Sequence, residues 1–140
     1  MPPLGYARAY QTQAVLTASP GQLVLMLYDG ALRFLSIAQE AFNMEETNFQ
    51  RFEVINKNLQ RVQAIIGELQ ATLNYEVGGD FAVTMHRLYD FYNRRVFEAN
   101  LKKDPTLLVD VEKFLREIRG AWSEMLRSQN SVAVDAEMRA

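Results

Sequence analysis

The side chains that could support catalysis are few in this 140-residue chain. The only histidine, His86, is followed four residues later by Asp90, a spacing that places both side chains on one helical face. A serine hydrolase would also need its nucleophile on a sharp turn between a strand and a helix, and the sequence contains no such turn. We therefore interpret His86 and Asp90 as an ordinary exposed helical pair.

Two other pairs of residues suggest a catalytic or phosphate-binding site but lack the further residues that such a site needs. Glu45 and Glu46 are adjacent carboxylates in a predicted loop, where they are typical of a solvated turn and not of an acid–base pair. Gly78 and Gly79 lack the lysine and the hydroxyl residue that a phosphate-binding loop requires. We expect no enzymatic activity and no catalytic residue.

The composition excludes further classes of site. With no cysteine, the chain has no disulfide, no thiolate metal site and no cysteine nucleophile. A single histidine is too few for a site with two imidazole ligands, so we expect neither a metal nor a cofactor. Fifteen basic and seventeen acidic residues give a net charge of −2, which does not favour binding of nucleic acid.

The sequence also predicts where the protein acts. The longest apolar run, residues 23–28, is far shorter than the roughly 18 residues of a membrane span, so we expect no membrane insertion. The first twenty residues lack the basic and then apolar pattern of a signal peptide. Because the absence of cysteine fits a reducing compartment, we expect a cytoplasmic protein.

Proline placement permits long helices. The four prolines stand at positions 2, 3, 20 and 105, which leaves 84 consecutive residues without one. Ser19, Pro20 and Gln22 match a helix start with a cap, a proline at the first helical position and a capping box. The first long helix is predicted at about 20–43.

Three further helices are predicted from apolar residues that recur in alternating steps of three and four, as in helices packed at shallow angles. Asp80 is the expected cap of the third helix, and Asp104 with Pro105 begins the fourth. The three stripes are Phe52, Ile55, Leu59, Val62, Ile66, Leu69 and Leu73; then Phe81, Met85, Leu88, Tyr92, Arg95 and Ala99; then Leu108, Val111, Leu115, Ile118, Trp122 and Met125. No stretch shows the alternation of a strand.

The predicted fold is therefore all-α, an antiparallel four-helix bundle over residues 19–128. Residues 1–18 carry a weak helical pattern and are expected to form a short N-terminal helix or hook, which docks on the bundle as a lid. Residues 129–140 are small and polar, and we expect a flexible, frayed tail there.

The helix at 20–43 is unusual because it carries two apolar stripes, whereas a small bundle requires about one stripe of ~100°. Leu23, Leu27 and Phe34 belong to one stripe, and Val24 and Tyr28 belong to the other. Charges are also sparse, since residues 1–42 hold only four of the chain's 32 charged side chains. Two interpretations stay open: a central core helix covered by the hook, or a groove for a partner helix beneath a removable lid.

Arg95 lies on the inward stripe of its helix, where an unpaired guanidinium would be costly to bury. It needs an internal partner or a route to water along its apolar stem. A structural bond and a role at a partner groove are both open.

Two blocks of the sequence resemble the flagellar export chaperones that bind flagellin (FliS-type). The blocks are Ala9–Val15, Thr17–Pro20 and Gln22–Phe34 near the N-terminus, then Leu88–Tyr92, Arg94–Arg95 and Glu98–Asn100. Trp122 also stands where the last helix of this family usually has tryptophan. The similarity covers about residues 6–126.

The resemblance implies a non-enzymatic bundle that binds the disordered C-terminal segment of flagellin in the cytoplasm. It further implies that binding prevents premature polymerisation and assists delivery to components of the flagellar type III export apparatus. The matching lid residue is Tyr10, assisted by Tyr6 or Ala7. The residues expected to bind the partner are Tyr10, Leu23, Leu27, Tyr28, Tyr89, Tyr92, Arg95 and Asn100, of which Tyr89, Tyr92 and Asn100 are either groove wall or scaffold.

Two other functions compete with this prediction. A structural or self-associating adaptor would use the same apolar stripe to pair with itself, and a homodimer of the free protein is also an open alternative. A small-ligand bundle would need polar groups inside the core, where the stripes offer only Arg95 and tyrosine hydroxyls.

Overall fold

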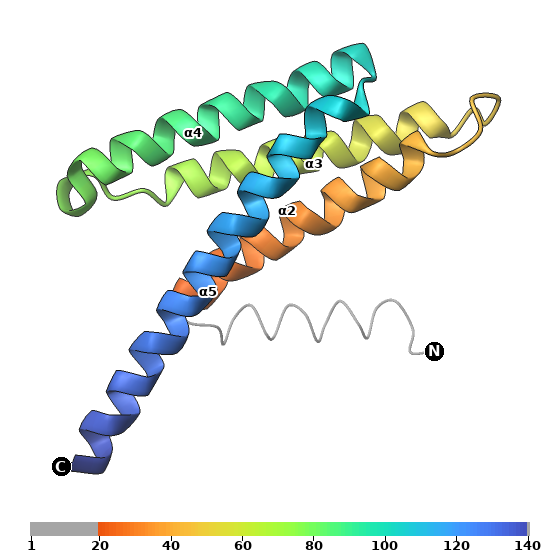
Figure 1. Cartoon of the computed structure of the whole chain (residues 1–140). Coiled ribbons are helices and arrows are strands. Elements are labelled where there is room, and N and C mark those ends of the chain that lie inside the picture. The colour runs from red at the N-terminus through yellow and green to blue at the C-terminus, as the bar shows by residue number, and fades with distance from the viewer. Residues whose placement is uncertain (1–19, 140) are drawn as a thin grey trace.

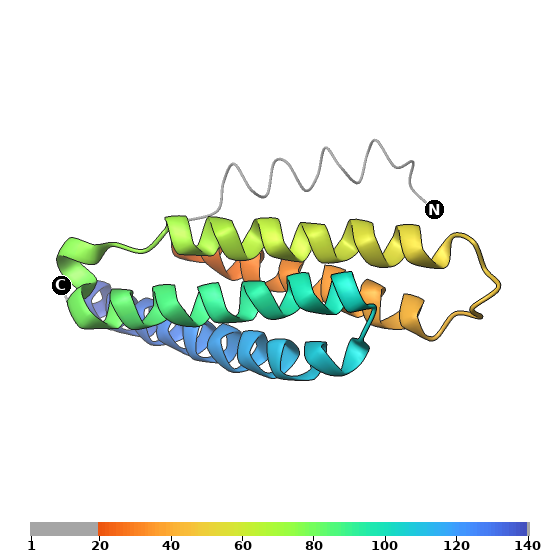
Figure 2. The same ribbon diagram turned by 90° about the horizontal axis from the view of Figure 1, so that it is seen from above.

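The computed structural model describes residues 20–139, with side chains described as far as Gln129. Four long helices and one short 3₁₀ helix follow one another: α2 (Pro20–Phe42), α3 (Arg51–Ala71), α4 (Tyr75–Lys102), η1 (Pro105–Leu107) and α5 (Leu108–Arg139). No strand occurs in residues 20–139. The predicted all-α four-helix fold is confirmed, and the helices run up and down between short connections (Figures 1 and 2).

The start signals of two helices are visible as side-chain caps. The Asn74 side chain accepts hydrogen bonds from the backbone N–H groups of Glu76 and Val77, at 3.1 and 3.2 Å. Asp104 accepts from the backbone N–H of Thr106 at 3.0 Å, at the start of η1. The capping signal at Ser19 lies outside the described residues.

α4 begins earlier than predicted, at Tyr75 behind the Asn74 cap, and Gly79 then separates its first turn from the longer helical part that starts beside the predicted Asp80. The break expected at the two glycines is real but lies inside the helix. Gly79 has φ 50° and ψ −124°, a backbone conformation outside the helical region, and it kinks α4 after its first turn. Glycine adopts this conformation at little cost because it has no Cβ atom.

α5 continues as a helix to Arg139, and the flexible tail expected over residues 129–140 stays a prediction. No glycine or proline interrupts the sequence after Gly120. A helix that is already nucleated extends at low cost through residues such as alanine, glutamate and methionine.

The core follows the predicted stripes on two helices. It is formed on α3 by Ile55, Leu59, Val62, Ile66 and Leu69, on α5 by Leu108, Val111 and Leu115, and on α2 by Tyr28, Ala31, Leu35, Ala38 and Ala41. Phe52, the first residue of the predicted α3 stripe, is instead 53% exposed.

On α4 the predicted stripe is confirmed at Met85 and Ala99, whereas three of its other residues lie one position away from the buried ones. The buried residues are Ala82, Met85, Tyr89, Val96 and Ala99. Phe81 and Leu88, which were expected to face inward, are 69% and 36% exposed. Both sets of residues recur at helical spacing, so the periodicity alone did not distinguish them.

α5 diverges from α4 along the molecule, as Figure 1 shows. Near η1 the two helices are linked by the rings of Tyr92 and Phe114, which stack with centroids 4.2 Å apart. Further along, α5 crosses α2 and extends beyond the end of the bundle (Figure 1). Near that end the indole of Trp122 donates a hydrogen bond to the carbonyl oxygen of Gly21, at 2.8 Å.

α2 is apolar enough, by length and composition, to cross a membrane, with a mean hydropathy of 1.2 over its most apolar window. The core helix of a globular bundle passes the same test. Ala31, Leu35 and Ala38 are fully buried against the other helices. Asp29 of α2 also forms a 2.6 Å ion pair with Arg119 of α5. We therefore interpret α2 as the central helix of the bundle.

Candidate partner-binding groove

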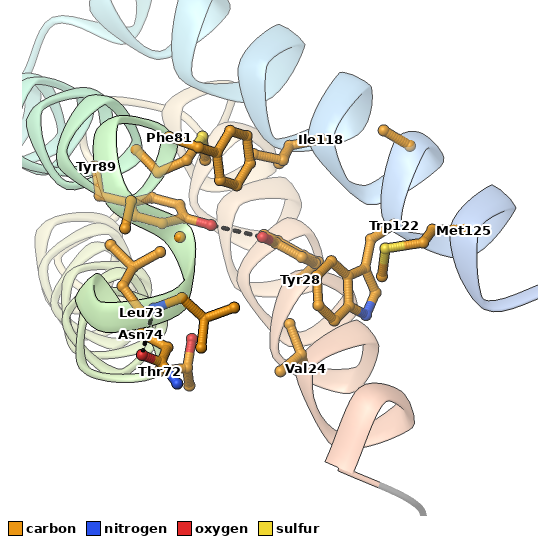
Figure 3. A pocket seen from close by; sticks show the side chains of 15 residues that line it. Val24, Tyr28, Thr72, Leu73, Asn74, Phe81, Tyr89, Ile118, Trp122 and Met125 are labelled. Atoms are coloured by element: carbon orange, nitrogen blue, oxygen red, sulfur yellow. Dashed lines mark hydrogen bonds between the residues drawn. The ribbon is translucent and has the colours of Figure 1, made fainter. Parts of the chain in front are cut away.

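An apolar groove of about 450 Å³ lies between the diverging parts of α4 and α5, with the first half of α2 as its floor (Figure 3). We call it the α4–α5 groove. Its lining residues are Val24 and Tyr28 of α2; Thr72, Leu73 and Asn74 of the α3–α4 connection; Val77, Gly78, Phe81, Ala82, Met85 and Tyr89 of α4; and Ile118, Ala121, Trp122 and Met125 of α5. Its volume is within the range of about 300–1,000 Å³ that is common for ligand sites.

One wall of the groove is held by the contact between α5 and the start of α2. Gly21 allows this close approach, because a Cβ atom at this position would lie 2.6 Å from a methyl carbon of Leu126. The hydrogen bond from Trp122 to the Gly21 carbonyl fixes the indole beside the start of α2. α5 is thereby anchored over the N-terminal end of α2, and the space towards α4 stays open.

The opposite rim is formed by the kinked start of α4. The Asn74 cap and the Gly79 kink place Val77 and Phe81 at the groove, where their side chains are 85% and 69% exposed. Large exposed apolar side chains beside a groove are typical of an interaction surface.

The floor contains one polar contact. The hydroxyls of Tyr28 and Tyr89 are 2.5 Å apart, and the two residues are only 3% and 2% exposed. Burial raises the pKa of both tyrosines, and for Tyr89 the hydrogen bond with Tyr28 raises the pKa further. Both phenols are therefore neutral at physiological pH.

The lining of the groove is largely apolar. No charged side chain is among its lining residues. Within residues 20–129 there is also no cluster of three or more His, Cys, Asp or Glu side chains able to hold a metal ion. Such a surface can bury apolar side chains of a ligand, with Tyr28, Tyr89, Thr72 and Asn74 as its polar groups.

Among the predicted partner-binding residues that the structure describes, Tyr28 and Tyr89 are the two that line the groove. Leu23 and Leu27 are half-buried on α2 and lie outside the groove lining. Tyr10 and the other expected lid residues, Tyr6 and Ala7, lie outside the described residues.

The remaining three predicted residues have partners elsewhere in the bundle. Tyr92 stacks on Phe114. Arg95 forms a 2.9 Å ion pair with Asp110 of α5. Asn100 donates a 2.8 Å hydrogen bond to the Asn56 side chain of α3, beside a separate shallow hollow.

Several groove residues were not predicted as binding residues. Phe81, Met85, Ile118, Trp122 and Met125 were assigned to apolar stripes and interpreted as core. No apolar stripe in the sequence included Val77, because it lies in the turn before the Gly79 kink. The second apolar stripe of α2 was the signal in the sequence that could have indicated this groove. Val24 and Tyr28 belong to that stripe, and they form the floor of the groove.

Comparison with known proteins identifies a single family. Residues 4–129 match the family model described as flagellar protein FliS. The chain is 38% identical over 121 residues to the flagellar secretion chaperone FliS of Bacillus subtilis, covering 86% of each chain. It is 34% identical to the protein of that name in Salmonella typhimurium, also covering 86% of each chain. The Vibrio cholerae protein is 35% identical and is matched over 88% of its length and 86% of this chain.

Proposed function

The chain belongs to the FliS family of flagellar secretion chaperones, and on this premise we propose that its cargo is the C-terminal segment of flagellin. In this proposal the chaperone binds the segment in the cytoplasm and prevents its premature polymerisation. It then assists delivery of flagellin to the flagellar type III export apparatus.

The observation that carries the proposal is the uncharged α4–α5 groove. An amphipathic helix binds in an apolar groove by inserting side chains from one of its faces. Phe81 and Val77 are exposed at the rim, and Met85 and Trp122 line the walls. A helical turn of cargo between α4 and α5 would cover these side chains. The same cargo face would then be unavailable for contacts between flagellin molecules.

The affinity requires more contacts than one groove provides. A micromolar complex needs about 8 kcal/mol of binding free energy. Ordering a disordered segment costs about 2–5 kcal/mol or more, and each large apolar side chain contributes about 1.5–3 kcal/mol when buried. Roughly five to eight anchors follow, so the cargo wraps more than one face of the bundle.

The N-terminal segment is part of the proposal as a lid that competes with cargo, with Tyr10 as its main contact and Tyr6 or Ala7 assisting. Deleting residues 1–16 is then expected to tighten cargo binding. Much weaker binding by the truncated protein would contradict the lid.

Calorimetric titration with a peptide of the last ~40 residues of flagellin tests the proposal, since that length supplies enough helical turns for the anchors. We expect micromolar or tighter binding. Flagellin without these residues should not co-purify with the chaperone, whereas full-length flagellin should.

A matched pair of variants locates the binding surface. Phe81→Ala removes an exposed ring from the groove and should weaken peptide binding by about tenfold or more, because a buried phenylalanine contributes about 1.5–3 kcal/mol. Phe49→Ala removes a ring that is 89% exposed in the α2–α3 connection, at the other end of the bundle, and should leave binding unchanged. Wild-type affinity in the Phe81→Ala variant would contradict the groove as the site.

The alternative occupant of the groove is a second copy of the chain. Sedimentation of the protein at micromolar concentration, with and without the peptide, separates the two. A dimer that persists when peptide is added would favour the self-associating adaptor.

A further inference from the structure

The Tyr28–Tyr89 pair has one more hydroxyl hydrogen than the contact between them uses. Each phenol carries one O–H donor, and its oxygen also accepts. At 2.5 Å one hydrogen lies between the two oxygens, and either residue can be its donor. The other hydroxyl hydrogen has no acceptor within residues 20–129.

The position of the pair makes this hydrogen relevant to a ligand. Figure 3 shows the two hydroxyls pointing toward each other between α2 and α4, in the floor of the α4–α5 groove. Both side chains are almost completely buried, and a buried donor that finds no acceptor within residues 20–129 is satisfied when a ligand supplies one. Because burial raises the pKa of each tyrosine, both keep their hydrogens at neutral pH.

We propose that the Tyr28–Tyr89 pair determines partner specificity by donating this hydrogen to an uncharged oxygen of the bound segment. The acceptor is a main-chain carbonyl at the end of a helical turn, or a side-chain amide or hydroxyl oxygen between apolar anchors. A carboxylate fits poorly, since the groove lining contains no positive charge to compensate its desolvation. The inference rests on the proposed function and adds the type of chemical group, an uncharged oxygen acceptor, that the groove selects in its cargo.

The consequence is discrimination among apolar segments. A segment that fills the groove with hydrocarbon alone leaves the donor unpaired and loses affinity. A segment that places an oxygen at the pair satisfies the donor. The pair also tolerates small shifts of the acceptor. Either tyrosine can donate the hydrogen that is not used between the two hydroxyls.

The test uses the full chain, the flagellin C-terminal peptide and three variants: Tyr28→Phe, Tyr89→Phe and the double variant. A single variant keeps one hydroxyl, whose hydrogen is free for the partner. At least one single variant should therefore bind the peptide within about twofold of the wild-type protein. The double variant has no donor and should bind about five- to tenfold more weakly.

Tyr75→Phe is the matched control, because it makes the same chemical change at a tyrosine outside the groove lining, whose hydroxyl bonds His86. Its affinity should equal that of the wild-type protein. Helical circular dichroism and thermal unfolding of each variant establish that the bundle is retained.

The outcomes separate the inference from the proposed function. A double variant that binds as tightly as the wild-type protein overturns the inference while the proposed function stands. Two single variants that are both as weak as the double variant also overturn it, since altered packing would then explain the loss. A wild-type protein that does not bind the peptide overturns both.

Discussion

The side chains of Tyr28 and Tyr89 are both buried and hydrogen-bonded to each other. The hydroxyls lie in a groove without charged residues, so ionising either phenol in the folded protein is unfavourable. Their raised pKa values link the stability of the bundle to alkaline pH.

The sign of this link follows from the protons bound in each state. An unfolded tyrosine loses its proton near pH 10, whereas Tyr28 and Tyr89 keep theirs in the folded protein. The unfolded state therefore binds fewer protons above pH 10, and the free energy of unfolding falls as the pH rises. We expect urea midpoints to decrease between pH 9 and pH 11.

The double variant Tyr28→Phe/Tyr89→Phe should show a smaller decrease over this range, because it removes both titrating groups. Tyr92→Phe serves as the comparison at a tyrosine that stacks on Phe114. If the double variant and the wild-type protein lose stability in parallel, the link to this pair is wrong.

At the scale of the helices, the kink in α4 depends on one glycine. Gly79 has a positive φ, and the space around its missing Cβ is open. Replacing it with alanine meets no steric contact with other residues, so any cost comes from the backbone conformation alone. The turn before the kink contains Val77, so the shape of the groove rim depends on this conformation.

Gly79→Ala is expected to destabilise the protein by about 1–3 kcal/mol, the usual cost of holding a residue with a side chain in a disfavoured region. Gly120→Ala is the control, since Gly120 lies within α5 and its missing Cβ also faces open space. That change should stabilise the protein by about 0.5–1 kcal/mol, because alanine is the better helix former. Urea unfolding measures both, and stabilisation by Gly79→Ala would rule out the strained conformation.

At the scale of the whole molecule, the groove exists because α5 packs on α2 and diverges from α4. Tyr92 and Phe114 hold α4 and α5 together near η1. Trp122 and Gly21 hold α5 on α2 towards the other end. The wedge between these two contacts is the α4–α5 groove, and its apolar lining belongs to no single helix.

A charge inside this wedge should block cargo without unfolding the bundle. Ala121 is exposed on α5 and lines the groove, so Ala121→Glu should weaken binding of the flagellin peptide more than tenfold. Ala64 is an exposed residue of α3 outside the groove lining, and Ala64→Glu should leave binding unchanged. Calorimetric titration compares the two, and unimpaired binding by Ala121→Glu would exclude the groove as the cargo site.

The sequence alone was sufficient for the helical elements and the family. Helix formation depends on residues three and four apart, so the stripe from Ile55 to Leu69 predicted the buried face of α3 correctly. The excess apolar surface of α2 also indicated a second contact surface, and two of its residues, Val24 and Tyr28, form the groove floor.

Only the tertiary structure decided which residues share the groove. Tyr92 and Asn100 were expected at the groove from the family resemblance, and Arg95 from its inward position, but they contact Phe114, Asn56 and Asp110 in other parts of the bundle. The selection of Ala82 and Tyr89 as the buried register of α4, and not Phe81 and Leu88, likewise required the neighbouring helices. The physical reason is that a helix's periodicity is local, whereas the crossing of α5 over α2 results from packing between residues about one hundred positions apart.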